Sequence, residues 1–242
     1  MQNSIYKLTL SDGTVCDIFI SHKKIKNFYI KILPSSTIKV SVPLKAYDED
    51  VNKFINSRKH WIEKILKKFR KINDTNIKDS LVNGGTVRIL DNRYFIYIYK
   101  AEKNNVILDG FNINIYAKEP EKDWYIEALY NMFLKFEAEK YFTKTIQKFL
   151  PVFQKYNISG VHLKVKPMKT KWGVCRPSER RITLNLHLYK TSAKCVDYVI
   201  FHELTHLIYG GHQKNFYNFI YKFMPDYRET EKILDIESAR LL

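Results

Sequence analysis

Residues 201 to 212 constrain the fold of this chain more than any other stretch. His202 and His206 are four residues apart, and His212 follows six residues after the second of them. On a helix, side chains four residues apart lie one above the other on the same face, so both imidazoles can reach a single metal ion. Glu203 is turned by about 100° around the helix axis from His202. Its carboxylate can therefore approach a water on that ion without becoming a ligand.

This spacing is the H-E-x-x-H motif of zinc-dependent peptidases, in which two imidazoles hold the ion and the glutamate is the general base. A catalytic zinc keeps three protein ligands and one open position for water. We therefore expect His202, His206 and His212 to bind one Zn²⁺ ion and Glu203 to be the catalytic residue. A lone histidine on an apolar helix is usually a core residue, but this combination favours a metal site.

The residues before the motif predict a largely buried helix with Thr191 or Ser192 as its N-cap. No proline or glycine interrupts it before Gly210. We expect Gly210 and Gly211 to end the helix in a left-handed turn, which would let the third histidine approach the ion. Metzincins have the same histidine separation but a glycine at the position of Tyr209, so the turn must be built differently here.

The first half of the chain alternates between apolar and polar residues, which predicts antiparallel β-hairpins. Between two such segments, residues 48–70 predict an amphipathic helix whose acidic first turn suits the positive end of the helix dipole. A polar stretch over residues 71–80 follows this helix. The strands are expected over residues 5–10, 14–20, 28–32, 37–42, 86–90, 93–99, 106–108 and 111–116.

The second half predicts a long helix over residues 123–156, because apolar residues recur there every three or four positions. A strand over 160–166, a basic, turn-like segment over 169–175 and a strand over 181–188 lead to the motif. Since an extended peptide often pairs with a strand edge, we expect the strand at 181–188 to align a substrate. The residue that would steady the oxyanion stays open among four candidates, Asn185, His187, Tyr209 and Tyr227.

Charge and cysteine content indicate which partners and which cellular compartment to expect. The formal net charge is +16, which favours acidic partners such as nucleic acid, although a well-solvated, lysine-rich surface explains the same count. No apolar run is long enough to span a bilayer, and residues 1–4 lack the basic and apolar regions of a signal peptide. Three scattered cysteines form no disulfide framework. We expect a reduced, cytoplasmic protein with no membrane contact.

Several segments carry a family resemblance. They are Lys171–Cys175, Leu184–Asn185, Asp197–His206 with His212, and Met224–Tyr227, with a looser match at Val42–Pro43 and Phe54–Ile62. Together they resemble the YgjP-like metallopeptidases, bacterial relatives of the SprT-like and other zincin proteases. The resemblance implies a zinc-dependent peptidase with the three histidines as ligands and Glu203 as base. This chain has Val174 where that family usually has a small residue, often serine, before the cysteine.

We therefore expect an α+β protein. Residues 1–120 would form an antiparallel β-rich region with one amphipathic helix (48–70), and residues 121–242 a helical connector and a zincin-like domain built on the H-E-x-x-H helix. The expected function is that of a metallopeptidase that hydrolyses peptide bonds of a peptide or protein substrate through a metal-activated water. The alternatives are a DNA-associated SprT-like protease and a non-catalytic zinc-binding module.

Overall fold

The computed structural model describes residues 3–32, 37–72 and 79–242, with side chains described except at residue 3 and residues 67–72. The chain divides into two compact units, residues 1–79 and 80–242. Both combine helices with strands, which confirms the α+β class. The turn between the strands expected at 28–32 and 37–42, and most of the polar stretch expected over 71–80, lie outside the described residues.

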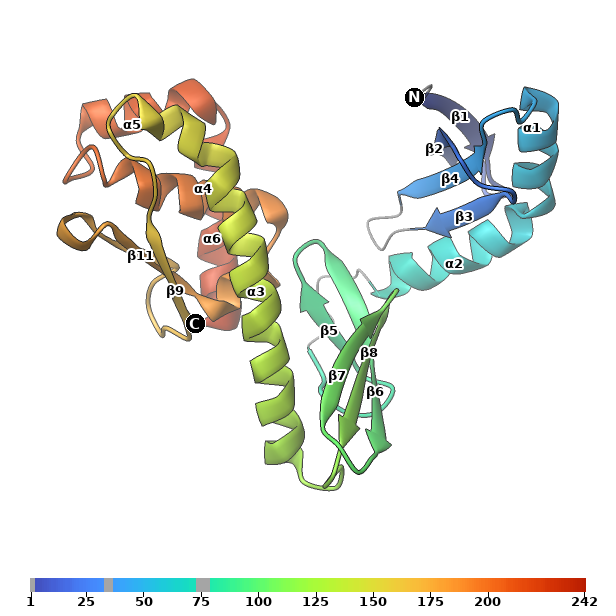
Figure 1. Ribbon diagram of the computed structural model, residues 1–242, viewed down its shortest axis with the longest axis horizontal. Coiled ribbons are helices and arrows are strands. Elements are labelled where there is room, and N and C mark those ends of the chain that lie inside the picture. Colours follow the sequence, from blue (N-terminus) through green and yellow to red (C-terminus); the bar gives the residue numbers. More distant parts are fainter. Residues whose placement is uncertain (1–2, 33–36, 73–78) are drawn as a thin grey trace. The chain divides into compact units, whose positions relative to one another are not determined.

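The first unit is a four-stranded sheet with two helices (Figure 1). The outer strand pairs are antiparallel and the central pair is parallel. The single helix expected over 48–70 consists of two helices, because the backbone leaves the helical region at Arg58. Their apolar faces bury Val51, Ile55 and Ile62. The elements are β1 (Asn3–Thr9), β2 (Val15–Lys23), β3 (Tyr29–Ile32), β4 (Ile38–Pro43), α1 (Asp48–Ser57) and α2 (Lys59–Ile72), and the sheet order is β1-β2-β4-β3.

The second unit opens with a sheet of the same topology. Its strands are β5 (Thr86–Ile89), β6 (Asn92–Lys100), β7 (Asn105–Asp109) and β8 (Asn112–Ala117), in the order β5-β6-β8-β7. Each hairpin is antiparallel as predicted, but the hairpins join through a parallel pair, β6 with β8. The expected antiparallel pairing therefore holds for the hairpins and not for the central pair of each sheet. Half-buried strands alternate in the same way whichever direction their neighbour runs, so the pattern does not distinguish the two pairings.

Helix α3 (Asp123–Gln154) joins that sheet to the rest of the second unit. Figure 1 shows it running from the β5–β8 sheet to the C-terminal helices. It contacts β7 and β8 near its start, and a strand and a helix of the C-terminal part further along. For this reason residues 80–120 belong to the same unit as the motif helix, whereas the sequence-based division placed the boundary after residue 120.

The C-terminal part combines a three-stranded sheet with three helices. The strands are β9 (His162–Lys166), β10 (Gly173–Arg176) and β11 (Arg181–Asn185), in the order β10-β11-β9, and the helices are α4 (Ala193–Thr205), α5 (Lys214–Phe223) and α6 (Tyr227–Leu241). Part of the segment predicted as a turn, 169–175, is thus the strand β10. The strand predicted over 181–188 ends at Asn185, where a 3₁₀ turn over Leu186–Lys190 begins.

The sheet order also corrects the expected substrate edge. Strand β11 is central, paired antiparallel with β10 and parallel with β9, so it has no free edge. Strand β10 is the edge strand that contacts α4. Among the described residues, no helix is long and apolar enough to cross a membrane.

Candidate metal centre

Helix α4 is anchored by a buried apolar face and a capped start. Ser192 is its N-cap, as predicted, and its hydroxyl accepts a hydrogen bond from the Cys195 amide at 3.3 Å. The helix ends at Thr205, earlier than the glycine pair that we expected to end it. Hydrogen bonds such as Tyr209 N to Thr205 O close the end of the helix, and neither Gly210 nor Gly211 has a positive φ. The predicted left-handed glycine turn was therefore wrong.

Three imidazoles converge at the C-terminal end of this helix. His202 lies in the last turn of α4, His206 is its C-cap, and His212 lies in the connection to α5. One ligand nitrogen from each ring lies within 4.8 Å of the others. Nε2 of His212 is 3.0 Å from Nε2 of His202. The structure thus brings together the three histidines that the spacing singled out.

Phe216 supports all three rings from one side. This side chain of α5 is fully buried, and its ring centroid lies 4.9 Å from that of His202, 4.7 Å from that of His206 and 4.8 Å from that of His212. A single apolar group therefore limits how far each imidazole can tilt.

The outer nitrogens of two imidazoles have hydrogen-bond partners. Nδ1 of His206 lies 3.2 Å from the carbonyl oxygen of Tyr209. Because a carbonyl can only accept, Nδ1 must carry the proton, which leaves Nε2 with a free lone pair. Nδ1 of His202 lies 3.4 Å from the Tyr198 hydroxyl. Burial, together with the neighbouring His206 and His212, lowers the pKa of His202 to about 3, and burial also lowers the pKa of His206.

Glu203 is held between the motif helix and β10. Its side chain is buried, and the Cys175 amide donates a hydrogen bond to its carboxylate. Burial raises the pKa of Glu203 to about 7, against the opposing effects of that amide and of Lys171. Relative to a carboxyl group in water, this environment favours the neutral form of Glu203.

Two adjoining hollows give access to these groups. One, of about 350 Å³, is lined by the three histidines, Glu203 and residues of β10. The other, of about 430 Å³, is bounded by α4, α6 and Trp172. Lys171, Gly173, His202 and Glu203 line both. The cleft thus runs past the histidines along the β10 edge.

The four candidates for an oxyanion group do not line these two hollows. Asn185 is fully buried, and its side-chain amide donates to the carbonyls of Met168 and Lys171, which makes it a support for the segment before β10. His187 lies in the 3₁₀ turn after β11 and not on a strand. The Tyr209 ring packs on Phe219, and Tyr227 stacks on Tyr198.

Several residues at the site were not predicted from the sequence. Phe216, Gly173, Tyr198 and Glu231 all contact or line it. Helix periodicity could have identified Tyr198, because it lies four residues before His202 and so on the same helix face. Cys175 lines the cleft, and burial, with Glu203 nearby, raises its pKa to about 12, so it stays a neutral thiol.

The histidines, the buried glutamate and the edge strand together are the features of a metallopeptidase. The chain belongs to the YgjP-like metallopeptidase family, since the family model described as "YgjP-like, metallopeptidase domain" matches residues 26–237. The resemblance noted in the sequence is thereby confirmed. The crystal structure of the metallopeptidase zymogen of Methanocaldococcus jannaschii jannalysin is similar over 39% of this chain and 94% of that chain, with 22% identity and a TM-score of 0.34. No curated protein matches the sequence.

Proposed function

We propose that this metallopeptidase is a cytoplasmic zinc enzyme in which His202, His206 and His212 hold one Zn²⁺ ion and Glu203 is the general base. The observation that carries the proposal is the convergence of three ring nitrogens within 4.8 Å of one another, beside a buried carboxylate. None of the three cysteines, all of which the structure describes, is in a disulfide, which fits a reduced compartment.

The donor set fits zinc. Neutral imidazole nitrogens are preferred zinc ligands, and a catalytic site uses three protein ligands. The Nδ1–H of His206 is engaged by a backbone carbonyl, which directs Nε2 toward the shared position. The low pKa of His202 keeps that ring neutral and able to bind a metal at neutral pH.

The chain's own groups then account for the proton transfers. A bound zinc ion would lower the pKa of a water ligand and polarise the peptide carbonyl. Glu203 accepts the proton of the attacking water and returns it to the leaving amine, a role that contributes about 10²- to 10⁴-fold in rate. The Cys175 amide orients the carboxylate meanwhile. An extended substrate would pair with the edge of β10, which lines the cleft.

The test combines metal content with cleavage of an unfolded protein. We expect the full chain to bind one zinc, His212→Ala to lose it, and Glu203→Gln to keep the zinc while cleavage falls by about 10²-fold or more. Zinc without cleavage in the parent would indicate a zinc-binding module in place of an enzyme. Equal cleavage by the parent and Glu203→Gln would show that Glu203 is not the general base. A parent that takes up no zinc contradicts the proposal altogether.

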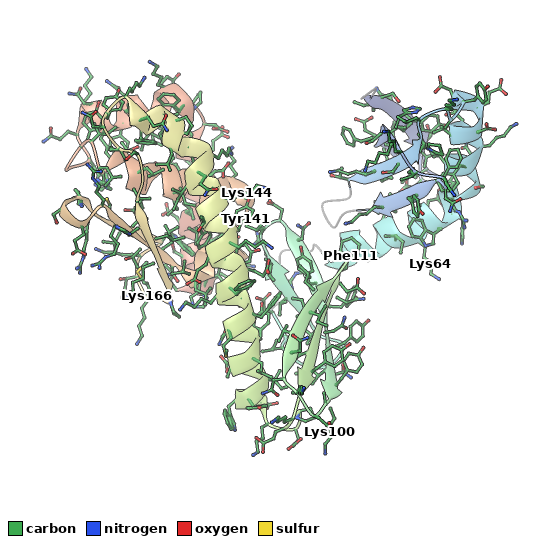
Figure 2. The ribbon with its side chains drawn as sticks, in the orientation of Figure 1. Lys64, Lys100, Phe111, Tyr141, Lys144 and Lys166 are labelled. Carbon is green, nitrogen blue, oxygen red and sulfur yellow. The ribbon has the colours of Figure 1, made fainter. Side chains whose placement is uncertain are left out.

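A second candidate is recruitment of the peptidase to nucleic acid. The register of β9, β10 and β11 places four cationic residues on one face of the sheet: Lys164, Lys166, Arg176 and Arg181. Glu179 pairs with both arginines, at 3.2 and 2.6 Å, while Lys166 points into solvent from the end of β9 (Figure 2). Such a face suits a phosphate backbone. DNA binding that weakens steeply with salt and is lost in Lys164→Glu/Lys166→Glu would support this candidate, and binding insensitive to salt would remove it.

A further inference from the structure

Two successive side-chain contacts link Glu231 of α6 to His202 through Tyr198. The Tyr198 hydroxyl donates a hydrogen bond to Oε1 of Glu231 and lies 3.4 Å from Nδ1 of His202. A phenol has one proton, and an ionised carboxylate can only accept. With that proton directed at Glu231, the phenol oxygen can only accept from His202. Nδ1 of His202 must then carry the proton, and its Nε2 keeps the free lone pair.

We propose that Tyr198 and Glu231 are positioning residues that hold His202 in the Nδ1–H tautomer, with Nε2 turned to the zinc site. This inference rests on the proposed function, because it assigns the pair a role toward a zinc ion held by the three histidines. Neither residue is a ligand or a catalytic group here. Glu231 acts on His202 only through the Tyr198 hydroxyl.

The surroundings of Tyr198 keep its hydroxyl in place. Tyr198 is buried, and its ring stacks on Tyr227 at 6.2 Å and 18°. Tyr227 stacks on Tyr217 at 5.9 Å, and Tyr217 stacks on His212 at 6.1 Å. The same row of tyrosines therefore reaches from the first histidine to the third. A rotation of the Tyr198 ring would break this row, so the ring cannot turn its hydroxyl away without loss of packing.

His206 provides an internal comparison. Its Nδ1 partner is the backbone carbonyl of Tyr209, which directs Nε2 in the same way but which no side-chain substitution removes. His202 has a side-chain partner, so only there can the effect of the outer hydrogen bond be removed by substitution. Metal-bound histidines generally donate their second N–H to such a partner, and its loss typically costs 10- to 100-fold in metal affinity.

The experiment measures zinc affinity by chelator competition in the full chain, in Tyr198→Phe, in Glu231→Gln and in the double variant. Tyr198→Phe removes only the hydroxyl and keeps the stacked ring. Glu231→Gln keeps the shape and removes the charge. Glu229→Gln, which removes the same charge at an exposed position of α6, is the matched control. In the metal-free proteins, ¹⁵N-resolved NMR of the histidine rings reports the tautomer of His202 independently of zinc.

We expect each single variant to bind zinc about tenfold or more weakly and the control to stay within about twofold of the parent. The double variant should lose no more zinc affinity than the single variant that binds zinc more weakly, because both substitutions disrupt the same pair of contacts. The parent should show the Nδ1–H form of His202, and Tyr198→Phe a mixture of tautomers. If Glu231→Gln does not fold, zinc affinity and the His202 tautomer are measured in Tyr198→Phe alone, and these two results test the proposal.

Three results overturn the proposal: zinc affinity within about threefold of the parent in both single variants, fully additive losses in the double variant, or a His202 tautomer that Tyr198→Phe leaves unchanged. A parent that binds no zinc would instead contradict the proposed function. The tautomer measurement would still show whether Tyr198 sets the tautomer of His202.

Discussion

The side chain of Glu203 occupies the space that a side chain at Gly173 would need. A β-carbon at position 173 would stand 2.6 Å from Oε1 of Glu203 and 2.7 Å from its Cγ. Real β-carbons do not approach other atoms so closely. The buried glutamate can therefore keep this position against β10 because that strand begins with glycine.

Gly173→Ala should displace the Glu203 side chain and reduce peptide cleavage without loss of zinc. A misplacement of about 1 Å in a catalytic group can cost 10²-fold, so we expect a fall in kcat/KM of about that size. Zinc content should match the parent, because the three atoms nearest to a β-carbon at position 173 all belong to Glu203, which is not among the proposed ligands. Gly160→Ala is the control, since a β-carbon there meets no atom within 4 Å. Full activity in Gly173→Ala would show that displacement of the Glu203 side chain does not impair cleavage.

The convergence of the imidazoles could be predicted because it depends on local geometry. Helix periodicity alone places His202 and His206 on one face. Alternation and periodicity along the rest of the chain predicted an α+β protein, which the observed elements confirm. The end of α4 could not be predicted in the same way. The helix closes through backbone hydrogen bonds at Tyr209 and not through Gly210, and no side-chain pattern encodes that choice.

The residues that pack around the histidines could not be predicted from the sequence, for a different reason. Phe216 and Glu231 come from α5 and α6 and reach the histidines only through tertiary packing. The edge strand was misplaced because β10 and β11 both carry the mixed polar and apolar residues of a half-buried strand, and strand order depends on pairing between distant segments. Only three-dimensional contacts distinguish the free edge from the central strand.

Glu203→Gln should change how the stability of the metal-free protein depends on pH. The pKa of Glu203 rises from 4.5 to about 7 on folding, chiefly through burial. Between these values the folded state keeps a proton that the unfolded state releases, so the free energy of unfolding falls as pH rises. The glutamine variant avoids this loss. Relative to the parent, its free energy of unfolding should increase by about 3 kcal/mol between pH 4.5 and pH 8.

Denaturant unfolding at several pH values measures this difference. The low pKa of His202 has the opposite effect, since the unfolded state then binds the extra proton below pH 6.5, but it is common to both proteins and cancels. Glu229→Gln, at an exposed position, should run parallel to the parent. A flat difference between Glu203→Gln and the parent would mean that Glu203 is not protonated on folding.

Phe216→Leu should weaken zinc affinity more than its cost in stability explains. A leucine cannot contact all three imidazole rings as the phenyl ring does, so the rings gain freedom that metal binding must remove. Phe219→Leu, on the same helix and also buried, packs on Phe201 and Tyr209 and not on the histidines. Both variants should lose about 1 to 3 kcal/mol of unfolding free energy.

Zinc competition separates the two phenylalanine variants. We expect about tenfold weaker zinc binding in Phe216→Leu and an affinity close to the parent's in Phe219→Leu. Equal affinities in the two variants would show that Phe216 contributes only to general packing of α5.

Zinc removal should loosen the second unit and leave the first unchanged. All three histidines lie in residues 80–242, and none lies in the unit formed by residues 1–79. A ligand that binds only the folded state stabilises it by RT ln(1 + [L]/Kd), about 4 kcal/mol at a thousandfold excess over Kd. Hydrogen exchange with and without a strong chelator should therefore show faster exchange in α4 and α5, while β2 and β4 keep their protection. His212→Ala should exchange in the same way with and without chelator. A chelator effect spread evenly over both units, or equally large in His212→Ala, would place the metal elsewhere.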